Sequence, residues 1–247
     1  MKTKKILFLF AALCLAAVLC VSAAAADLKE AEEKAQGLKE LGLFRGVSDT
    51  DFDLGREPTR VEALVMLIRT LGKEGEAQNG TWSHPFTDVP AWANAYVGYA
   101  WTKGLTKGIS ATEFGVGNAS AAMYVTFMLR ALGYSDAEGD FSWDDPFGIA
   151  ERAGILPDSV DTVHFLRADV AVISYSALSA KMKNSQDKLS DRLIAAGVFT
   201  AAAYKSVTDR MPPEGGLTSG NTPIFVLPVQ PKDPELPAGT NLPAIGD

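Results

Sequence analysis

The stretch GLFRGVSDTDFDLGREPTRVE, residues 42–62, decides the fold of this chain. It joins the end of one helix, marked by Gly42, to the start of another at Thr59 through a polar loop. The pattern returns as GLTKGISATEFGVGNASAAM at residues 104–123 and, more altered, as GILPDSVDTVHFLRAD at residues 154–169. A helix pair that recurs in this way needs its neighbouring copies to bury its apolar face. The chain is therefore expected to be all-α, with three helix-loop-helix repeats.

Each copy is expected to contain a first helix, a loop and a second helix. The expected first helices cover residues 35–41, 95–101 and 147–153, and the expected second helices cover residues 59–71, 120–132 and 167–182. The glycines that end the first helices are separated by 62 and by 50 residues. The copies have therefore diverged by insertion, which loops tolerate better than helices.

The N-terminus has the composition of a secretory signal peptide. Three lysines within the first five residues precede an apolar run over residues 6–21, and four alanines stand before Asp27. This order is typical of an exported protein, and we expect cleavage near Ala24 or Ala26. A lipoprotein anchored through Cys20 is the alternative, but Leu19 before it is larger than such a signal usually allows. We therefore assign residues 1–26 to a signal peptide and expect a secreted protein.

Removal of the signal peptide changes the charge and the cysteine content of the chain. The formal charge goes from -7 to -10 when the three lysines leave, which disfavours nucleic acid and anionic membranes as partners. Both cysteines, Cys14 and Cys20, leave as well, so we expect no disulfide and no cysteine metal site. No second apolar run approaches the roughly 20 residues of a membrane span, and no transmembrane segment is expected in the mature chain.

The C-terminal part divides into a helical stretch and a Pro-rich tail. Leu189, Leu193, Ile194 and Val198 follow helical spacing, so residues 185–210 are expected to form one trailing helix packed on the third copy. Residues 211–247 are rich in proline, with Gly and Ser between, and are expected to form an extended or disordered tail.

The sequence Thr59-Arg60-Val61-Glu62 opens an amphipathic helix. Thr followed three residues later by Glu is a capping box, which assigns both residues to structural roles. Arg60 is left unexplained, because a cation in the first turn of a helix opposes the helix dipole. The plain interpretation is a solvated arginine, and the alternative is a donor to a carboxylate-bearing ligand. Arg167 stands at the same place in the third copy, where Asp169 is the expected cap, and this recurrence favours a binding role.

The sequence Phe86-Thr87-Asp88-Val89-Pro90, with Trp92 nearby, completes a resemblance to a known family. Together with the Gly-aliphatic helix ends, the Phe-x-x-Gly loops and the Thr-Arg-x-Glu helix start, it resembles the S-layer homology (SLH) domain, in three copies over about residues 31–183. The resemblance implies a pseudo-threefold bundle. It also implies non-covalent attachment of an exported bacterial protein to cell-wall polysaccharide, often a pyruvylated secondary polymer.

The family's motif residues carry over to four positions of this chain. The resemblance implies ligand binding by Arg60 and Arg167, and by Asp88 and Trp92. The second copy departs from the motif, because Ala121 stands where the arginine is expected. The third copy has Leu166 where the threonine is expected. At most two grooves are therefore expected to bind, so attachment is expected to be weak or to depend on several molecules.

We accordingly expect SLH-like repeats at residues 27–74, 82–135 and 140–184, and a cell-wall or S-layer location. The expected function is non-catalytic attachment to cell-wall polysaccharide, with other surface-layer proteins as further partners. An interaction scaffold whose altered repeats contact another surface protein is the alternative. A wall hydrolase is disfavoured, since no catalytic domain fits into what lies outside the repeats.

Other sites fit the sequence less well. Asp49, Asp51 and Asp53 alternate as in a calcium loop, but the EF-hand positions for Gly and Glu hold other residues. The carboxylates Asp144, Asp145 and Glu151 have nothing that fixes a glycosidase pair. His84 and His164 belong to no nucleophile or zinc motif. We expect that the protein is not an enzyme and that it binds no cofactor and no metal.

Four tryptophans, Trp82, Trp92, Trp101 and Trp143, lie in the second copy and at the start of the third. Aromatic rings can stack on sugar faces, but Trp101 follows the apolar stripe of its helix and is expected in the core. Trp92 is expected to be half exposed.

Overall fold

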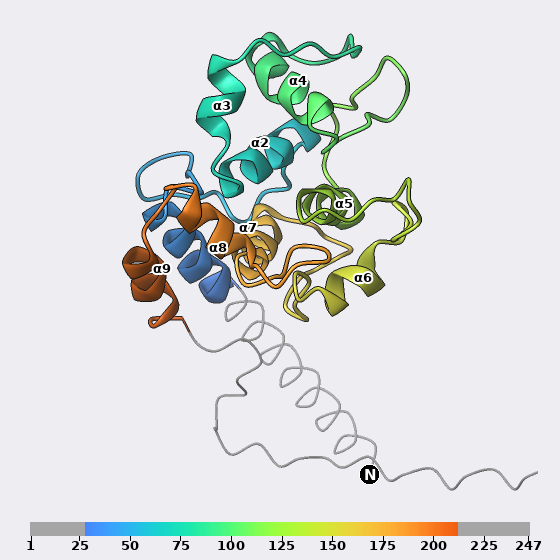
Figure 1. Cartoon of the computed structure of the whole chain (residues 1–247). Coiled ribbons are helices and arrows are strands. Elements are labelled where there is room, and N and C mark those ends of the chain that lie inside the picture. The colour runs from blue at the N-terminus through green and yellow to red at the C-terminus, as the bar shows by residue number, and fades with distance from the viewer. Residues whose placement is uncertain (1–27, 212–247) are drawn as a thin grey trace, which may run out of the picture. The chain divides into compact units, whose positions relative to one another are not determined.

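The computed structural model describes residues 28–211, and Figure 1 shows their arrangement. The expected signal peptide and all of the expected tail except Met211 lie outside the described residues. Within 28–211 every regular element is a helix, in agreement with the predicted all-α class. Residues 28–40 are helical. The helices that follow are α2 (Arg60–Thr70), α3 (Glu74–Asn79), η1 (Ala91–Ala93), α4 (Asn94–Thr102), α5 (Ala121–Ala131), α6 (Phe147–Arg152), α7 (Arg167–Ala177), α8 (Leu189–Ala195) and α9 (Ala201–Thr208).

Three helices of equal length form the centre of the structure. Helices α2, α5 and α7 have 11 residues each and begin at Arg60, Ala121 and Arg167. Each of the three contacts the other two, and α5 and α7 are seen end-on beside α2 in Figure 1. Most of their side chains are buried, because neighbours cover them on several sides. They are the second helices of the three predicted copies.

The first helix of each copy packs on the second helix of the copy before it. Helix α4 contacts α2, and α6 contacts α5. The helix at residues 28–40 packs on α7, since Ala31 clusters with Val172 and the Lys34 ammonium lies 5.8 Å from the Tyr175 ring centroid. Each predicted first helix thus contacts one of the three central helices, and the arrangement as three repeats with threefold symmetry stays a prediction.

The loops of the first two copies share one hydrogen-bond pattern. The N–H groups of Val47 and Ser48 donate to the Asp51 carbonyl at 2.8 and 3.2 Å. In the second copy those of Ile109 and Ser110 donate to the Glu113 carbonyl at 2.9 and 3.2 Å. The third copy instead has a turn at Asp161, which agrees with its more altered sequence.

Backbone hydrogen bonds join the copies at the starts of two central helices. The N–H of Arg60 donates to the carbonyl of Gly117 at 2.8 Å, and the N–H of Arg167 donates to that of Arg56 at 2.9 Å. The first bond joins the start of α2, in the first predicted copy, to the loop of the second. The other joins the start of α7, in the third predicted copy, to the loop of the first. In the described residues the N–H of Ala121, at the start of α5, has no corresponding bond.

The predicted helix stops at glycine are confirmed. Gly42, Gly104 and Gly154 have φ values of 76°, 72° and 73°. This left-handed conformation suits glycine because it has no Cβ, and it ends a helix with hydrogen bonds back to the last turn.

Three other predictions need correction. Helix α7 ends at Ala177 and not near Met182. The single trailing helix is two helices, α8 and α9, since Gly197 with φ 72° ends the first and Thr200 caps the second. Helix α3 was not predicted. It is a short solvent-facing segment of which Ala77 is the buried residue.

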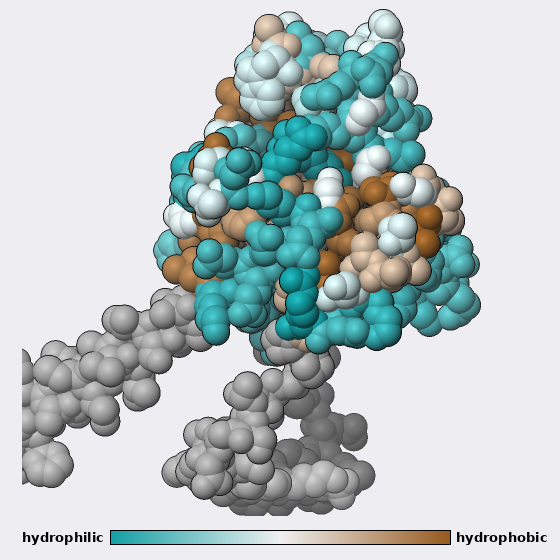
Figure 2. Space-filling view, turned by 90° about the vertical axis from the view of Figure 1, so that its left-hand side faces the viewer, coloured by the Kyte–Doolittle hydropathy of each residue, from teal (hydrophilic) through white to brown (hydrophobic). Residues whose placement is uncertain are grey.

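Hydrophilic residues run down the middle of the face that Figure 2 shows, with hydrophobic patches on either side. No helix in the range 28–211 has the length and apolar character needed to cross a membrane.

Candidate functional site

Arg60 is a buried cation at the first position of α2. Its residue is 7% exposed, and its guanidinium carbon lies 4.9 Å from the ring centroid of Phe114 and 5.1 Å from that of Phe127. Within the described residues its Nε is buried and has no hydrogen-bond partner. Such a group is costly to bury, and an unsatisfied donor calls for a specific explanation.

Arg60 also lines a cavity of about 560 Å³. The other walls come from the loop after α4, from α5 and from the opening of the third copy. They include Lys107, Gly108, Ile109, Ser120, Met123, Thr126, Phe127, Arg130, Asp136, Trp143 and Asp144. A concave site of this size, part apolar and with a few convergent polar groups, suits a small ligand.

The side chains that line this cavity carry three positive and two negative charges, and the carboxylate of Asp88, outside the lining, lies close enough to interact with Arg60. Asp136 pairs with Lys107 at 2.8 Å and with Arg130 at 2.9 Å. The Arg130 hydrogen bond chiefly holds the pKa of Asp136 well below its usual range. Burial, with the nearby charge of Arg130, lowers the pKa of Arg60 to about 10. Arg60 therefore stays charged at neutral pH, and the lining residues carry one positive charge in excess.

The first copy repeats the ion-pair triad of the second. Glu74 pairs with Arg69 at 2.9 Å and with Arg45 at 2.9 Å, as Asp136 does with Arg130 and Lys107. Arg69 and Arg130 stand at the same position of α2 and α5. The two triads thus occupy corresponding positions of the first and second predicted copies, and each ties a residue of the loop after the first helix to the second helix. Among the residues that line its cavity, Arg60 is the cation that takes no part in a triad.

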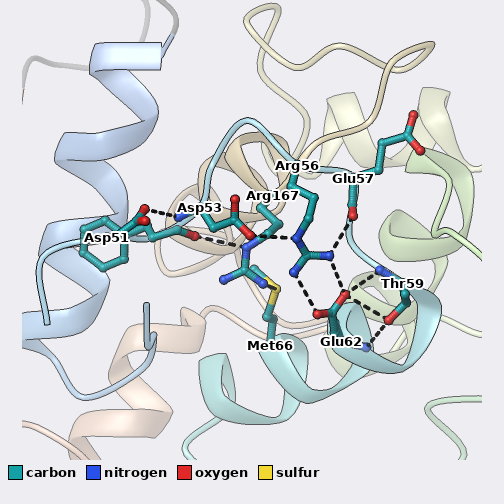
Figure 3. Close-up of polar contacts among 9 residues, drawn as sticks. Asp51, Asp53, Arg56, Glu57, Thr59, Glu62, Met66 and Arg167 are labelled. Carbon is teal, nitrogen blue, oxygen red and sulfur yellow. Dashed lines mark hydrogen bonds and ion pairs between the residues drawn. The ribbon is translucent and has the colours of Figure 1, made fainter. Parts of the chain in front are cut away.

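Arg167 lies in an equivalent setting but is satisfied within the protein. Its residue is 5% exposed, its Nε donates to the Phe52 carbonyl at 3.0 Å, and its Nη1 lies 3.6 Å from the Met66 sulfur (Figure 3). Phe52 and Met66 correspond by position to the two rings around Arg60. Burial, with the nearby charge of Arg56, lowers the pKa of Arg167. Its Nε is thus bonded within the protein, whereas the Nε of Arg60 has no partner in the described residues.

Ion pairs of Arg56 lie beside Arg167, where the second copy has smaller or uncharged residues. Arg56 contacts Asp53 at 2.7 Å and the two Glu62 oxygens at 2.8 and 3.0 Å (Figure 3). The corresponding residues of the second copy include Gly115 and Met123. This difference explains why the cavity lies at Arg60 and does not include Arg167.

The structure separates Asp88 and Trp92 from the cavity lining. Both carboxylate oxygens of Asp88 accept backbone hydrogen bonds at 2.8 Å, from Phe114 and Gly115. Although burial alone would raise it, these bonds hold the pKa of Asp88 below its usual value. Asp88 therefore shapes the loop that carries Phe114, a ring on Arg60. Trp92, on η1, is 59% exposed and lines no part of the Arg60 cavity.

The tryptophan that lines the cavity is Trp143, to which sequence reasoning assigned no role. It is 66% exposed. The signal that could have found it is its place at the altered opening of the third copy, in Phe141-Ser142-Trp143. Trp101, expected in the core, is 39% exposed and packs one side on Phe86 at a centroid distance of 5.2 Å.

The predicted caps are present in the structure. The Glu62 N–H donates to the Thr59 hydroxyl at 3.3 Å and the Thr59 N–H to the Glu62 carboxylate at 2.8 Å, which completes the capping box. Asp169 accepts from the N–H of Leu166 at 2.7 Å and of Asp161 at 2.9 Å. Leu166 has no side-chain acceptor, so this copy keeps half of the box.

The capping box predicts a pH dependence of stability. The Arg56 hydrogen bond, with support from Thr59, lowers the pKa of Glu62 to about 2, below the value of about 4.3 expected in the unfolded chain. A lowered pKa stabilises the folded state above pH 4.3, and this contribution is lost as the pH falls towards 2. We expect Glu62→Gln to show a smaller loss of unfolding free energy between pH 7 and pH 3 than wild type, measured by urea denaturation. Glu151→Gln, at an exposed position, is the control and should keep the wild-type profile. An unchanged pH profile in Glu62→Gln would contradict this assignment.

The histidines and aspartates considered above for catalytic or calcium sites make local contacts. His84 Nε2 lies 3.2 Å from the Asn94 side-chain oxygen, and His164 Nδ1 lies 3.4 Å from Asp161. Asp144 bonds to Ser142. In the calcium-like loop, the Asp53 N–H donates to Asp51. Across residues 28–211 no group of three or more His, Cys, Asp or Glu is placed to hold a metal ion.

Another cavity, of about 610 Å³, lies between the helix at 28–40 and the residues after α9. Its lining has four carboxylates, Glu32, Glu33, Glu40 and Asp49. Of its two cations, Lys29 pairs with Glu33 at 3.8 Å and Arg210 is bonded to Glu40. Its acidic wall disfavours an acidic ligand. The Arg60 cavity is therefore the stronger candidate.

Three known proteins are similar to this chain. A "Cell surface protein" of Thermoanaerobacter kivui is 29% identical over 195 residues, 71% of this chain and 24% of that protein. A "Middle cell wall protein" of Brevibacillus brevis is 30% identical and a "Surface layer protein" of Brevibacillus choshinensis 31% identical, each over 106 residues, 42% of this chain and 10% of the relative. No family model matches the chain.

The chain thus spans a quarter or less of the length of these relatives. Their names are those of surface proteins and none is that of an enzyme. The similarity agrees with the predicted location of an exported protein in the bacterial cell wall or surface layer. It also agrees with surface components as partners.

Proposed function

We propose that this chain attaches non-catalytically to bacterial cell-wall polysaccharide, and that the Arg60 cavity holds an acidic group of the sugar. The observation that carries the proposal is a buried, charged arginine whose Nε has no partner in the described residues and which lines a 560 Å³ cavity. A carboxylate in the cavity would balance the positive charge that the lining carries in excess and would bind the guanidinium. A pyruvyl substituent on a wall sugar carries such a carboxylate, as the SLH resemblance implies.

The proposal includes the assignment of residues 27–74, 82–135 and 140–184 as divergent SLH repeats. The recurring helix contacts, the ion-pair triads and the paired loops support it. Of the three arginine positions, the second holds Ala121 and the third is engaged with Phe52. We therefore assign the main binding site to Arg60 alone. A single site of this kind fits attachment strengthened by several molecules on one polymer.

The test is co-sedimentation of the mature protein with sacculi purified from the bacterium that encodes it. We expect the protein to pellet with intact sacculi and to stay in solution after acid extraction of the secondary polymer. The double variant Arg60→Ala, Arg167→Ala should stay in solution in both cases, with circular dichroism used to verify its folding. A folded wild-type protein that does not co-sediment with intact sacculi would refute wall attachment.

An interaction scaffold is the second candidate. The absence of an arginine at Ala121 and the engagement of Arg167 favour it, since two of three positions have no free cation. The hydrophobic patches on the face in Figure 2 could then contact another surface protein. Failure to bind sacculi, with capture of a surface-layer protein from the same bacterium, would support this candidate.

A further inference from the structure

Trp143 is a large, exposed aromatic residue held in a fixed turn. Its turn is closed by an antiparallel bridge between Ser142 and Asp145, whose N–H donates to the Ser142 carbonyl at 3.2 Å. Ser142 also bonds to the Asp144 carboxylate. The backbone that carries Trp143 is thus braced by hydrogen bonds, and Trp143 is 66% exposed on it.

The turn is tied to the wall of the Arg60 cavity. The Thr126 hydroxyl, on α5, donates to the Trp143 carbonyl at 3.4 Å, and all of these residues line the cavity together with Arg60. The site therefore draws on all three copies. The first supplies Arg60, the second supplies α5 and its preceding loop, and the opening of the third supplies Trp143 and Asp144.

The other tryptophans are differently placed. Trp82 packs edge-on against Tyr99 at a centroid distance of 5.2 Å, and Trp101 packs against Phe86 in the same way. Trp92 is exposed but does not line the cavity. Trp143 is therefore the one tryptophan in residues 28–211 that is both exposed and part of this cavity.

The chemistry of these side chains fits a sugar with an acidic substituent. A pyranose ring has an apolar C–H face, which an indole covers, and hydroxyl groups at its edge, which a carboxylate accepts. The Met123 side chain adds apolar surface, and Arg60 supplies the cation at the other side of the lining. Ligand sites commonly combine an apolar platform with a few polar groups that fix orientation.

We propose that Trp143 is the stacking platform for a pyranose ring whose acidic group binds Arg60, and that Asp144 accepts a hydrogen bond from a hydroxyl of that ring. This inference rests on the proposed wall attachment and names the residues that give it sugar specificity. It moves the aromatic role from Trp92 to a residue at the opening of the third copy.

The experiment compares Trp143→Ala, Trp143→Phe and Trp92→Ala in co-sedimentation with intact sacculi over a range of sacculus concentrations. We expect Trp143→Ala to weaken binding about tenfold, the effect of about 1.4 kcal/mol of lost stacking. Trp143→Phe should stay within about threefold of wild type, and Trp92→Ala should match wild type. Thermal unfolding should be unchanged in all three, because both positions are exposed.

A second readout uses tryptophan fluorescence with polysaccharide released from the sacculi by acid. The change in wild-type emission on adding this polysaccharide should disappear in Trp143→Phe, although that variant still binds. Wild-type binding together with unweakened Trp143→Ala would overturn the Trp143 assignment and leave wall attachment standing. No binding by folded wild type would overturn both.

Discussion

Replacement of Arg60 by alanine is expected to weaken binding to intact sacculi by about 10- to 100-fold while the protein stays folded. Hydrogen bonds to a charged group contribute about 1.5–3 kcal/mol, and about 1.4 kcal/mol corresponds to tenfold in affinity. The folded state loses the packing of the guanidinium on Phe114 and Phe127, but removal of a buried cation whose Nε has no partner in the described residues offsets part of this loss. The measurement is co-sedimentation over a range of sacculus concentrations, beside a urea denaturation curve.

Arg167→Ala is the matched control, since both arginines open a central helix and are buried to the same degree. Its loss breaks the 3.0 Å bond to the Phe52 carbonyl and should lower the free energy of unfolding by about 1–3 kcal/mol. Binding by the folded fraction should match wild type. Equal loss of binding in both single variants would show that Arg167 also contacts the polymer and would contradict a single site at Arg60.

The local signals for the helices of the repeat could be predicted from sequence because each is set by nearby residues. A glycine such as Gly42 ends a helix through its own backbone freedom, and Thr59 with Glu62 starts one through hydrogen bonds three residues apart. Both features appear in the structure at the predicted positions. The break at Gly197 carries the same signal, a glycine followed by the aliphatic Val198, and was missed, whereas the short α3 carries a weak signal because Ala77 is its buried residue.

The roles of the two arginines could not be separated from sequence. Arg60 and Arg167 share their position, and their difference comes from partners far away in the chain. Arg167 finds the Phe52 carbonyl 115 residues earlier, whereas the Arg60 guanidinium lies over Phe114 and Phe127 and next to a cavity. Such contacts depend on how the copies close on one another, and a local motif does not encode that. The same reason explains why Trp143 was missed.

Phe127→Ala is expected to cause the largest loss of stability among these variants. The residue is 1% exposed in α5, where this helix packs on α2 and α7. Truncation of a buried phenylalanine costs about 3–5 kcal/mol through lost burial and the cavity that remains. Since a domain of this kind is stable by about 5–15 kcal/mol, the urea midpoint should fall steeply. A decrease of less than about 1 kcal/mol in the free energy of unfolding would contradict the described packing of α5.

The same position also tests how the protein holds Arg60. Phe127→Leu keeps most of the volume and should cost less than about 1.5 kcal/mol, but it removes the ring that lies 5.1 Å from the guanidinium. Loss of a cation–π contact of about 0.5–2 kcal/mol leaves Arg60 less firmly placed, so sacculus binding should weaken by about 2- to 30-fold. Met66→Leu at the equivalent position of α2 is the control and should bind like wild type, because Met66 contacts Arg167. If both leucine variants bind like wild type, the aromatic clamp does not position Arg60. Weakened binding in Phe127→Leu alone would show that the buried ring contributes to attachment through the arginine it contacts.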